Sequence, residues 1–359
     1  TNLALKQYPD ALAGFAQVLS LNPNHAEATY NRGLTYDALA AKSEALDDYD
    51  EAIRLDGEDA RFYISRGDLY RSQERFEDAI NDYGDAIRLD PDAADVYHKR
   101  GSAYKITGQL GDALSDYNIV LDLNVDDIDA FNARGNILQS LARYEQAITD
   151  YDNAIRLNPV DVDAYRNRGR SYQEIDRLQE ALVNYEEAIR LDPEDAVAFS
   201  NRGSICQALE RFPEAIAYYG EAARLDPENV AAYAGRGAIF QILARYPEAL
   251  KDLDTALAID PEYHGVHYDR GRIFDALGNF EDALTEYDEE MRINPENVFA
   301  LYGRGNAYQA INRFTEAEAD YSDAIRLEGE FSAAYASRGK TRQASGQFEE
   351  ALADFDRVI

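Results

Sequence analysis

The chain contains a single cysteine, Cys206, among its 359 residues. One thiol cannot form a disulfide within the chain, and its place at a predicted core position indicates a small apolar filler. A lone buried thiol suits a reducing or an oxidising compartment equally, so it predicts no cellular location. Long apolar runs are also missing, and no stretch has the apolar length that spans a membrane.

Basic residues are scarce as well, since 36 Lys and Arg stand against 68 Asp and Glu and the net charge is -32. Contacts to phosphates require a basic stripe, and the chain has no run of Lys and Arg. The sequence therefore predicts no nucleic-acid partner. Two interpretations of the acidic charge stay open: it keeps the protein soluble, or part of it recruits a basic partner by long-range attraction that salt would weaken.

Residues arranged for catalysis are lacking too. The chain shows no Ser, His and Asp arrangement for nucleophilic catalysis and no glycine-rich phosphate loop. His264 and His267 lie three residues apart on one predicted helix, a spacing that can share a metal, but His267 falls at a core position and no carboxylate or cysteine obviously completes a site. We therefore predict no catalytic residue, no metal site and no cofactor, and a protein that is not an enzyme.

What the chain has instead is a period of 34 residues. Ten Arg-Gly pairs recur at this step: Arg32-Gly33, Arg66-Gly67, Arg100-Gly101, Arg134-Gly135, Arg168-Gly169, Arg202-Gly203, Arg236-Gly237, Arg270-Gly271, Arg304-Gly305 and Arg338-Gly339. An unbroken period of this length is the signature of a solenoid whose units stack on their neighbours.

Other positions repeat when each unit is numbered so that this Gly is position 8. Position 20 is Ala in all ten units, position 24 is aromatic or once Leu253, and position 4 is aromatic in seven units. Seven of the ten prolines fall at position 32 and three at position 18. The spacings of three and four draw an apolar stripe on each of two successive helices, and the prolines mark the end and the first turn of the second helix. Each unit is therefore predicted to be a helical hairpin.

This pattern resembles the tetratricopeptide repeat over essentially the whole chain. That family's pattern has a large residue at position 4, Gly at 8, an aromatic at 11, Ala at 20 and 27, and Pro at 32. The chain departs from it at position 7, where Arg replaces the usual apolar residue. The resemblance implies an all-α fold, a right-handed superhelical α-solenoid of helix-turn-helix hairpins.

The repeat frame predicts the organisation of the chain. Residues 1–25 would form a partial repeat, the end of a first helix plus a second helix, and residues 26–359 ten tandem repeats, the last incomplete, that start at 26, 60, 94, 128, 162, 196, 230, 264, 298 and 332. We expect one continuous array, because each repeat contacts its neighbours. The chain begins at Thr1 and stops at Ile359 inside a repeat, so we expect uncapped ends that can support a homo-oligomer, and a start without Met leaves a localisation signal open.

The arginine at position 7 needs a partner, because it neighbours the apolar positions 4, 8 and 11. An acid stands at position 23 in eight repeats: Asp48, Asp82, Asp116, Asp150, Asp252, Glu286, Asp320 and Asp354. We predict a ladder of guanidinium-carboxylate pairs along the solenoid. The alternative is a basic row that binds acidic ligands.

Function is expected on the inner wall, which in this family is formed by the first helix of each repeat, chiefly at positions 2, 5, 6, 9, 12 and 13. Positions 5 and 9 differ from copy to copy, and position 12 is Gln in six repeats. A row of amides can hydrogen-bond an extended peptide backbone, although solvated amides explain the row equally well. The candidate ligand-binding residues on this wall are His98, Asn132, Asn136, Gln139, Arg166, Asn167, Arg170, Gln173, Asn201, Gln207, Gln241, Tyr268, Arg272, Tyr302 and Asn306.

Part of this wall partly matches the family's clamp for the C-terminal carboxylate of a peptide. Asn136 and Asn167 match its two Asn, whereas Asn132, Val197 and Asn201 stand where the clamp carries cations. We therefore expect no true clamp. If a ligand with an acidic group binds anywhere, we expect it at the most polar part of the wall, formed by Asn132, Asn136, Arg166, Asn167, Arg170 and Gln173.

The favoured function is a non-catalytic protein-protein interaction scaffold that binds extended peptide segments or partner domains in its groove. Two alternatives stay open. One is a structural solenoid that self-assembles end to end into filaments, and the other is the docking region of a larger multidomain protein.

Overall fold

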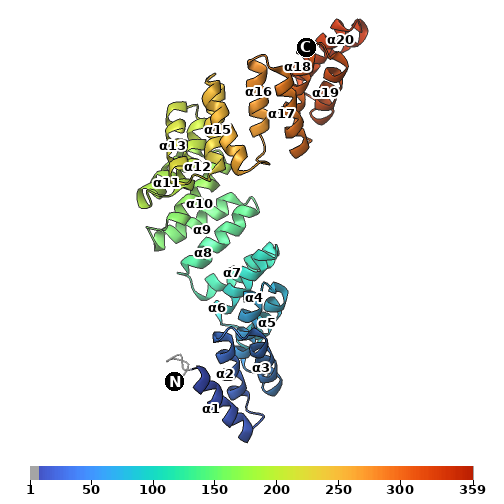
Figure 1. The fold of residues 1–359 in the computed structure, drawn as a ribbon. Helices are drawn as coiled ribbons and strands as arrows, with labels where there is room; N and C mark the ends of the chain where they lie inside the picture. Colours follow the sequence, from blue (N-terminus) through green and yellow to red (C-terminus); the bar gives the residue numbers. More distant parts are fainter. Residues whose placement is uncertain (1–7, 359) are drawn as a thin grey trace. The chain divides into compact units, whose positions relative to one another are not determined.

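The computed structural model describes residues 8–358, and over this range the regular secondary structure is helical, without a strand (Figure 1). The helices are α1 (Tyr8–Leu21), α2 (Ala26–Ala38), α3 (Lys42–Leu55), α4 (Ala60–Ser72), α5 (Phe76–Leu89), α6 (Ala94–Ile106), α7 (Leu110–Leu123), α8 (Ile128–Ser140), α9 (Tyr144–Leu157), α10 (Val162–Glu174), α11 (Leu178–Leu191), α12 (Ala196–Ala208), α13 (Phe212–Leu225), α14 (Val230–Ile242), α15 (Tyr246–Ile259), α16 (Val266–Ala276), α17 (Phe280–Ile293), α18 (Val298–Ala310), α19 (Phe314–Leu327), α20 (Ser332–Ala344) and α21 (Phe348–Phe355).

The helices form successive hairpins, which confirms the predicted all-α solenoid. Each even-numbered helix from α2 to α8 and from α12 to α20 packs as the first helix of a hairpin on the next odd-numbered helix. A bond from Arg168 to Asn184 joins α10 to α11 in the same way. Pro213 and Pro247 lie in the first turns of α13 and α15, as their spacing predicts, because a missing N-H costs little there. Asp127 and Asn297 cap the first helices α8 and α18, because their side chains accept the backbone N-H groups of Ala130 and Ala300.

The chain divides into two compact units, one up to Asn184 and one from Tyr185 onward, and each consists of the same hairpins. The predicted division into a partial repeat and ten full-frame repeats stays a prediction, and its two extremes, residues 1–7 and 359, lie outside the described residues. None of the helices within residues 8–358 combines the length and the apolar character needed to cross a bilayer.

Small residues bring the two helices of a hairpin together, as their recurrence predicts. In the first full hairpin, Ala45 and Tyr49 are completely buried. A Cβ atom placed on Gly33 would lie 2.9 Å from Cε1 of Tyr49, which is closer than van der Waals contact allows. The glycine therefore makes room for the ring at position 24, and the ring supplies the buried area. Cys206 is 1% exposed, which confirms its role as a core filler.

The turn inside each hairpin contains a residue in the left-handed conformation. This residue stands at position 15 in all ten repeats, as Ala40, Glu74, Gly108, Ala142, Asp176, Glu210, Ala244, Gly278, Asn312 and Gly346. Only three of the ten are glycine. After α8, the N-H of Arg143 donates to the carbonyl of Leu138 at 2.8 Å, the bond that closes a helix end around a left-handed residue. This turn has no clear signal in the sequence, because most of the residues at position 15 are not glycine.

The ladder of arginines and acids is present as predicted. In seven repeats, Nε and Nη2 of the arginine donate to the two carboxylate oxygens at 2.6–2.9 Å. In the eighth, Nη2 of Arg270 lies 3.2 Å from Oε1 of Glu286. The bidentate geometry and the burial of the carboxylates make these pairs structural, so the arginines do not form a free basic row.

The arginines also bind the preceding repeat, which the sequence analysis missed. Nη1 of Arg66 donates to Asp50 at 2.6 Å, and Nη1 of Arg304 donates to Asp288 at 2.7 Å. Asp50 and Asp288 stand at position 25 of the repeat before. One guanidinium therefore ties its own hairpin together and links it to its neighbour.

Two repeats lack the acid at position 23 and use other partners. Nε of Arg168 donates to the amide oxygen of Asn184 at 2.8 Å. The guanidinium carbon of Arg202 lies 4.5 Å from the ring centre of Tyr218, a cation-π contact.

The helix α16 corrects one expectation. His264 and His267 are not on one helix, because α16 starts at Val266 and His264 lies in the preceding turn. Gly265 adopts φ 85° there, and its N-H donates to the buried carboxylate of Glu290 at 2.9 Å. Glu290 stands at position 27, where most repeats have Ala, so the core is polar here. Its bond to Gly265 holds the turn that precedes α16, and α16 begins only at Val266.

Candidate functional site

Within each unit, the first helices of neighbouring hairpins contact one another, and we call the surface that they form in that unit its inner wall. These contacts join α2 to α4, α6 to α8 and α8 to α10 in the first unit, and α12, α14, α16, α18 and α20 in series in the second. All fifteen candidate residues from the sequence analysis lie on these first helices.

In the first unit, the amide candidates are largely occupied by bonds within the protein. The side-chain oxygen of Asn136 accepts the hydroxyl of Tyr151 at 2.8 Å and the amide of Asn167 at 3.1 Å. Asn132 donates to Asp161 at 2.8 Å. The two Asn residues that match a carboxylate clamp are thus bonded to each other.

The cations of this region differ in their availability. Arg166 forms an ion pair with Asp163, one turn earlier on α10. Arg170 is exposed. The ring of His98 meets Tyr117 edge-on, with ring centres 5.2 Å apart, as expected for a packed side chain. We propose that an acidic group of a ligand would bind in this region mainly through Arg170.

The row of glutamines at position 12 has a structural role in part. Gln139 donates to the carbonyl of Asn167 and to Ser171 on the next first helix. Gln207 and Gln309 accept the hydroxyls of Tyr219 and Tyr321 at 3.0 and 2.9 Å. The amide group of Gln139 donates within the protein, whereas Gln207 and Gln309 each use the side-chain oxygen as an acceptor. Asn201 also lies on the wall, on α12, and Gln241, on α14, is 9% exposed.

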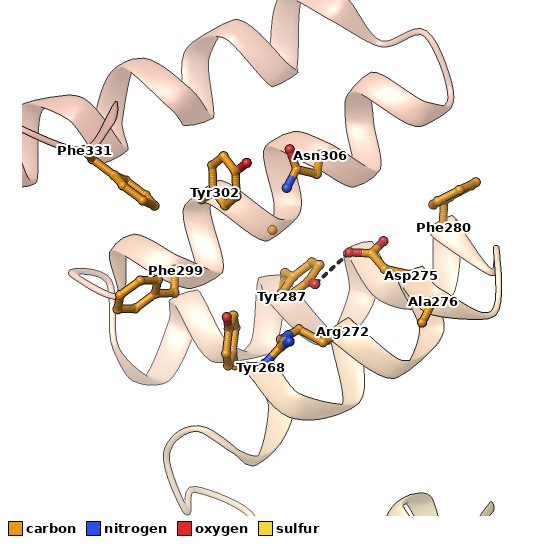
Figure 2. Close-up of a pocket in the computed structure, with 11 residues that line it drawn as sticks. Tyr268, Arg272, Asp275, Ala276, Phe280, Tyr287, Phe299, Tyr302, Asn306 and Phe331 are labelled. Carbon is orange, nitrogen blue, oxygen red and sulfur yellow. Dashed lines mark hydrogen bonds between the residues drawn. The ribbon is translucent and has the colours of Figure 1, made fainter. Parts of the chain in front are cut away.

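The inner wall of the second unit contains a cavity of about 690 Å³ between α16, α17, α18 and the start of α20 (Figure 2). Four of the candidate residues line it: Tyr268, Arg272, Tyr302 and Asn306. The structure adds seven that the sequence analysis did not select: Asp275, Ala276, Phe280, Tyr287, Phe299, Gly303 and Phe331.

Aromatic rings make up much of the cavity wall. The ring centres of Tyr302 and Phe331 are 5.1 Å apart, and those of Phe299 and Phe331 are 5.9 Å apart. Phe299 stands at position 2 of its repeat and is 57% exposed, which is unusual for a phenylalanine. Phe331 lies between α19 and α20, outside the inner-wall positions, so the repeat frame gave no signal for it.

The glycine at position 303 lets the cavity form. A Cβ atom on Gly303 would lie 2.7 Å from Cζ of Tyr287, a completely packed ring. The ring of Tyr287 and the backbone of α18 thus approach closely, because Gly303 has no side chain between them.

Two acids of α16, Asp275 and Asp269, are largely shielded from water. Burial raises the pKa of Asp275 to about 6, although the hydroxyl of Tyr287 donates to its Oδ2 at 2.7 Å. Burial also raises the pKa of Asp269 to about 6, and the charge of Arg272 offsets part of that shift. Desolvation of the charged form is the main cause in both.

Metal-ligating groups do not gather in the described part of the chain: within residues 8–358, no cluster of three or more His, Cys, Asp or Glu could hold an ion. His267 instead contacts Glu286 through Nδ1 at 2.8 Å, inside the polar core of α16 and α17.

Comparison with protein families identifies the repeat. Residues 67–108 and 135–176 match a family described as TPR repeat. Residues 162–195 and 196–229, and residues 3–60, 243–298 and 302–359, match families described as tetratricopeptide repeat. The chain belongs to the tetratricopeptide repeat family. As a member of it, the protein is an interaction scaffold, of a kind that is generally non-catalytic. A comparison with curated proteins finds no match.

The chain is similar to several solved structures, two of which match its fold with a TM-score above 0.5. The APC/C hetero-tetramer Cut9-Hcn1 is 13% identical, covers 99% of this chain and 91% of its own, and has a TM-score of 0.56. A tetratricopeptide repeat protein from Parabacteroides merdae is 21% identical over 64% of this chain and 91% of its own, with a TM-score of 0.52. YrrB, described as a TPR protein with an unusual peptide-binding site, is 27% identical over 51% of this chain and 95% of its own, with a TM-score of 0.46.

Proposed function

We propose that this tetratricopeptide repeat protein is a non-catalytic scaffold that binds an extended segment of a partner protein on the inner wall of α16, α18 and α20. The observation that carries the proposal is the cavity of about 690 Å³ lined by Tyr268, Phe299, Tyr302 and Phe331. Its volume falls within the range of ligand sites, and aromatic rings around a hollow commonly anchor partner side chains.

The charge distribution supports the same proposal. The inner-wall positions 2, 5, 6, 9, 12 and 13 of α12, α14, α16, α18 and α20 contain four charged residues among thirty: Asp269, Arg272, Asp275 and Lys340. The chain as a whole carries a net charge of -32. A wall that is poor in charge on so acidic a protein favours contact with another chain over solvation, because charged residues are depleted at the centres of interfaces.

The test is to fill the cavity without disturbing the core. Ala276 is exposed at the cavity, so Ala276→Trp would occupy it from the surface. Ala258 is an exposed alanine on the second helix α15, and Ala258→Trp is the matched control. Random dodecapeptides displayed on phage are selected on the unmodified chain, and the enriched peptides are synthesised for fluorescence anisotropy.

We expect Ala276→Trp to weaken binding of the selected peptides at least tenfold and Ala258→Trp to leave it unchanged. Peptides that bind all three proteins equally would place recognition elsewhere and would refute the proposed function.

A further inference from the structure

The carboxylate of Asp275 lies at the cavity with too few hydrogen-bond donors. Its Oδ2 accepts the hydroxyl of Tyr287, and its Oδ1 is buried with no hydrogen-bond partner among residues 8–358 (Figure 2). An ionised carboxylate can accept about four hydrogen bonds. Leaving a buried charge with one donor is costly, so the position of this acid needs an explanation.

The fold itself does not require an acid here. Asp275 stands at position 12 of its repeat, and Gln207 and Gln309 stand at the same position in two other repeats of the unit. Each of these glutamines accepts a hydroxyl from the tyrosine twelve residues later, as Asp275 does. An uncharged amide therefore performs the same packing role, and the negative charge of Asp275 is left for another purpose.

Arg272, which lines the same cavity, forms no ion pair with Asp275 that would neutralise it. Arg272 precedes it by one helical turn, but the guanidinium carbon lies 5.7 Å from the ring centre of Tyr268. Its charge acts on Asp269. Burial raises the pKa of Asp269, and the charge of Arg272 lowers it part of the way back. The pKa of Asp275 is shifted by burial and by Tyr287, with no contribution from a cation. Arg272 is thus engaged toward the start of α16.

The remaining walls of the cavity suit a cation on an aliphatic stem. Tyr268, Phe299, Tyr302 and Phe331 present aromatic rings to the cavity. Ring faces attract Lys and Arg head groups, and the methylene stems of these side chains pack on apolar surface. The net charge of -32 also attracts basic segments over long range.

We propose that the cavity binds a lysine or arginine side chain from a partner protein segment, with its stem between the aromatic rings and its cation paired with Asp275. This rests on the proposed function, because it names the anchor residue of the segment bound on the inner wall. The net acidic charge attracts such a segment over long range, and the carboxylate of Asp275 is the group that recognises its basic side chain.

The test uses the dodecapeptides selected on the unmodified chain and measures their affinity in about 150 mM salt, where long-range attraction is screened. Asp275→Gln copies the side chain of Gln309 and so preserves the bond from Tyr287. Glu228 is an exposed acid in the turn before α14, and Glu228→Gln is the matched control for loss of one negative charge. Each selected peptide is compared with a version in which its basic residue is replaced by Gln.

We expect the enriched peptides to share a Lys or Arg, and its replacement or Asp275→Gln to weaken binding about tenfold, as for a charge-assisted hydrogen bond. Glu228→Gln should leave the affinity unchanged. The melting temperature of Asp275→Gln should be equal to or above that of the unmodified chain, which separates lost recognition from lost folding. Arg272→Gln should strengthen binding, because it removes a like charge; weaker binding would indicate an acidic ligand group and overturn the inference.

The other outcomes distinguish this inference from the proposed function. Peptides that Ala276→Trp blocks but Asp275→Gln does not would overturn the basic anchor and leave the scaffold intact. Equal losses with Asp275→Gln and Glu228→Gln would show non-specific attraction and also overturn it. A selection that yields no peptide sensitive to Ala276→Trp would overturn both.

Discussion

Removing one carboxylate of the ladder tests whether the pairs of arginine and acid hold the hairpins together. Asp150 is the clearest case, because Arg134 donates to it twice, at 2.8 and 2.6 Å, and the aspartate side chain is only 3% exposed. Asp150→Ala removes both bonds and leaves the guanidinium against the hairpin with a single remaining donor bond, to Asn118 at 2.7 Å.

The expected loss follows from the burial of the two partners. Breaking a buried ion pair by removing one partner costs about 3–5 kcal/mol. The side chain of Arg134 is 23% exposed, so water can solvate part of the orphaned guanidinium. We therefore expect Asp150→Ala to lower the free energy of unfolding by about 2–4 kcal/mol. With a urea dependence of about 2–3 kcal/mol per molar, the urea midpoint should fall by about 1 M.

The measurement is urea unfolding followed by circular dichroism, with Glu174→Ala as the control, since Glu174 is exposed at the end of α10. Asp150→Asn should be intermediate, because it reproduces the pairing of Arg168 with Asn184. A solenoid can unfold in parts, so amide exchange in α8 and α9 should show the same order. Equal midpoints for Asp150→Ala and Glu174→Ala would refute a structural ladder.

Four further predictions concern the turns, the cavity, the acids and the end of the chain. Ala142→Gly should raise the free energy of unfolding by about 0.5–1 kcal/mol, because Ala142 holds φ 55°; Ala133→Gly, inside α8, should lower it by about 1 kcal/mol in the same urea titration. Gly303→Ala should cost about 1–3 kcal/mol by overpacking against Tyr287. Gly329→Ala, with nothing within 4 Å, should be neutral, and equal effects would contradict the close approach. Because the folded pKa of Asp275 and Asp269 is about 6 and an exposed Asp titrates near pH 4, the folded chain binds more protons between about pH 4 and 6. Its unfolding free energy should therefore fall as pH rises through this window, and thermal melts of Asp275→Gln should show a smaller fall. Phe348 and Leu352 on α21 are 67% and 62% exposed, so the predicted self-association, measured by light scattering over a concentration series, should weaken in Phe348→Ser. A constant monomer mass would rule it out.

The sequence by itself determined the hairpins and the contacts inside them. Gly33 faces Tyr49 and Arg134 faces Asp150 because each pair is separated by 16 residues across one turn, and that spacing recurs in nearly every repeat. A contact within one repeat joins the same two repeat positions each time, so it can be read from the sequence period. A repeat without the contact appears as a break in the pattern.

Contacts between repeats depended on the tertiary structure. The bond from Arg66 to Asp50 joins two repeats, and the residue that corresponds to Asp50 varies from Asp to Gly along the chain, as at Gly84. The left-handed residue at Ala142 was likewise hidden, because the closed helix end imposes that conformation on a residue that does not favour it.

The candidate site shows the same division. The repeat frame placed Tyr268, Arg272, Tyr302 and Asn306 on the inner wall, but their convergence on one cavity is set by how α16, α18 and α20 pack. Phe331 enters the cavity from a connection between helices. Asp275 places a carboxylate where Gln309 places an amide, and each accepts a tyrosine hydroxyl. The sequence period determines which residues lie on the inner wall. Packing between repeats decides which of them meet, because the wall positions are free to vary without breaking the hairpin beneath them.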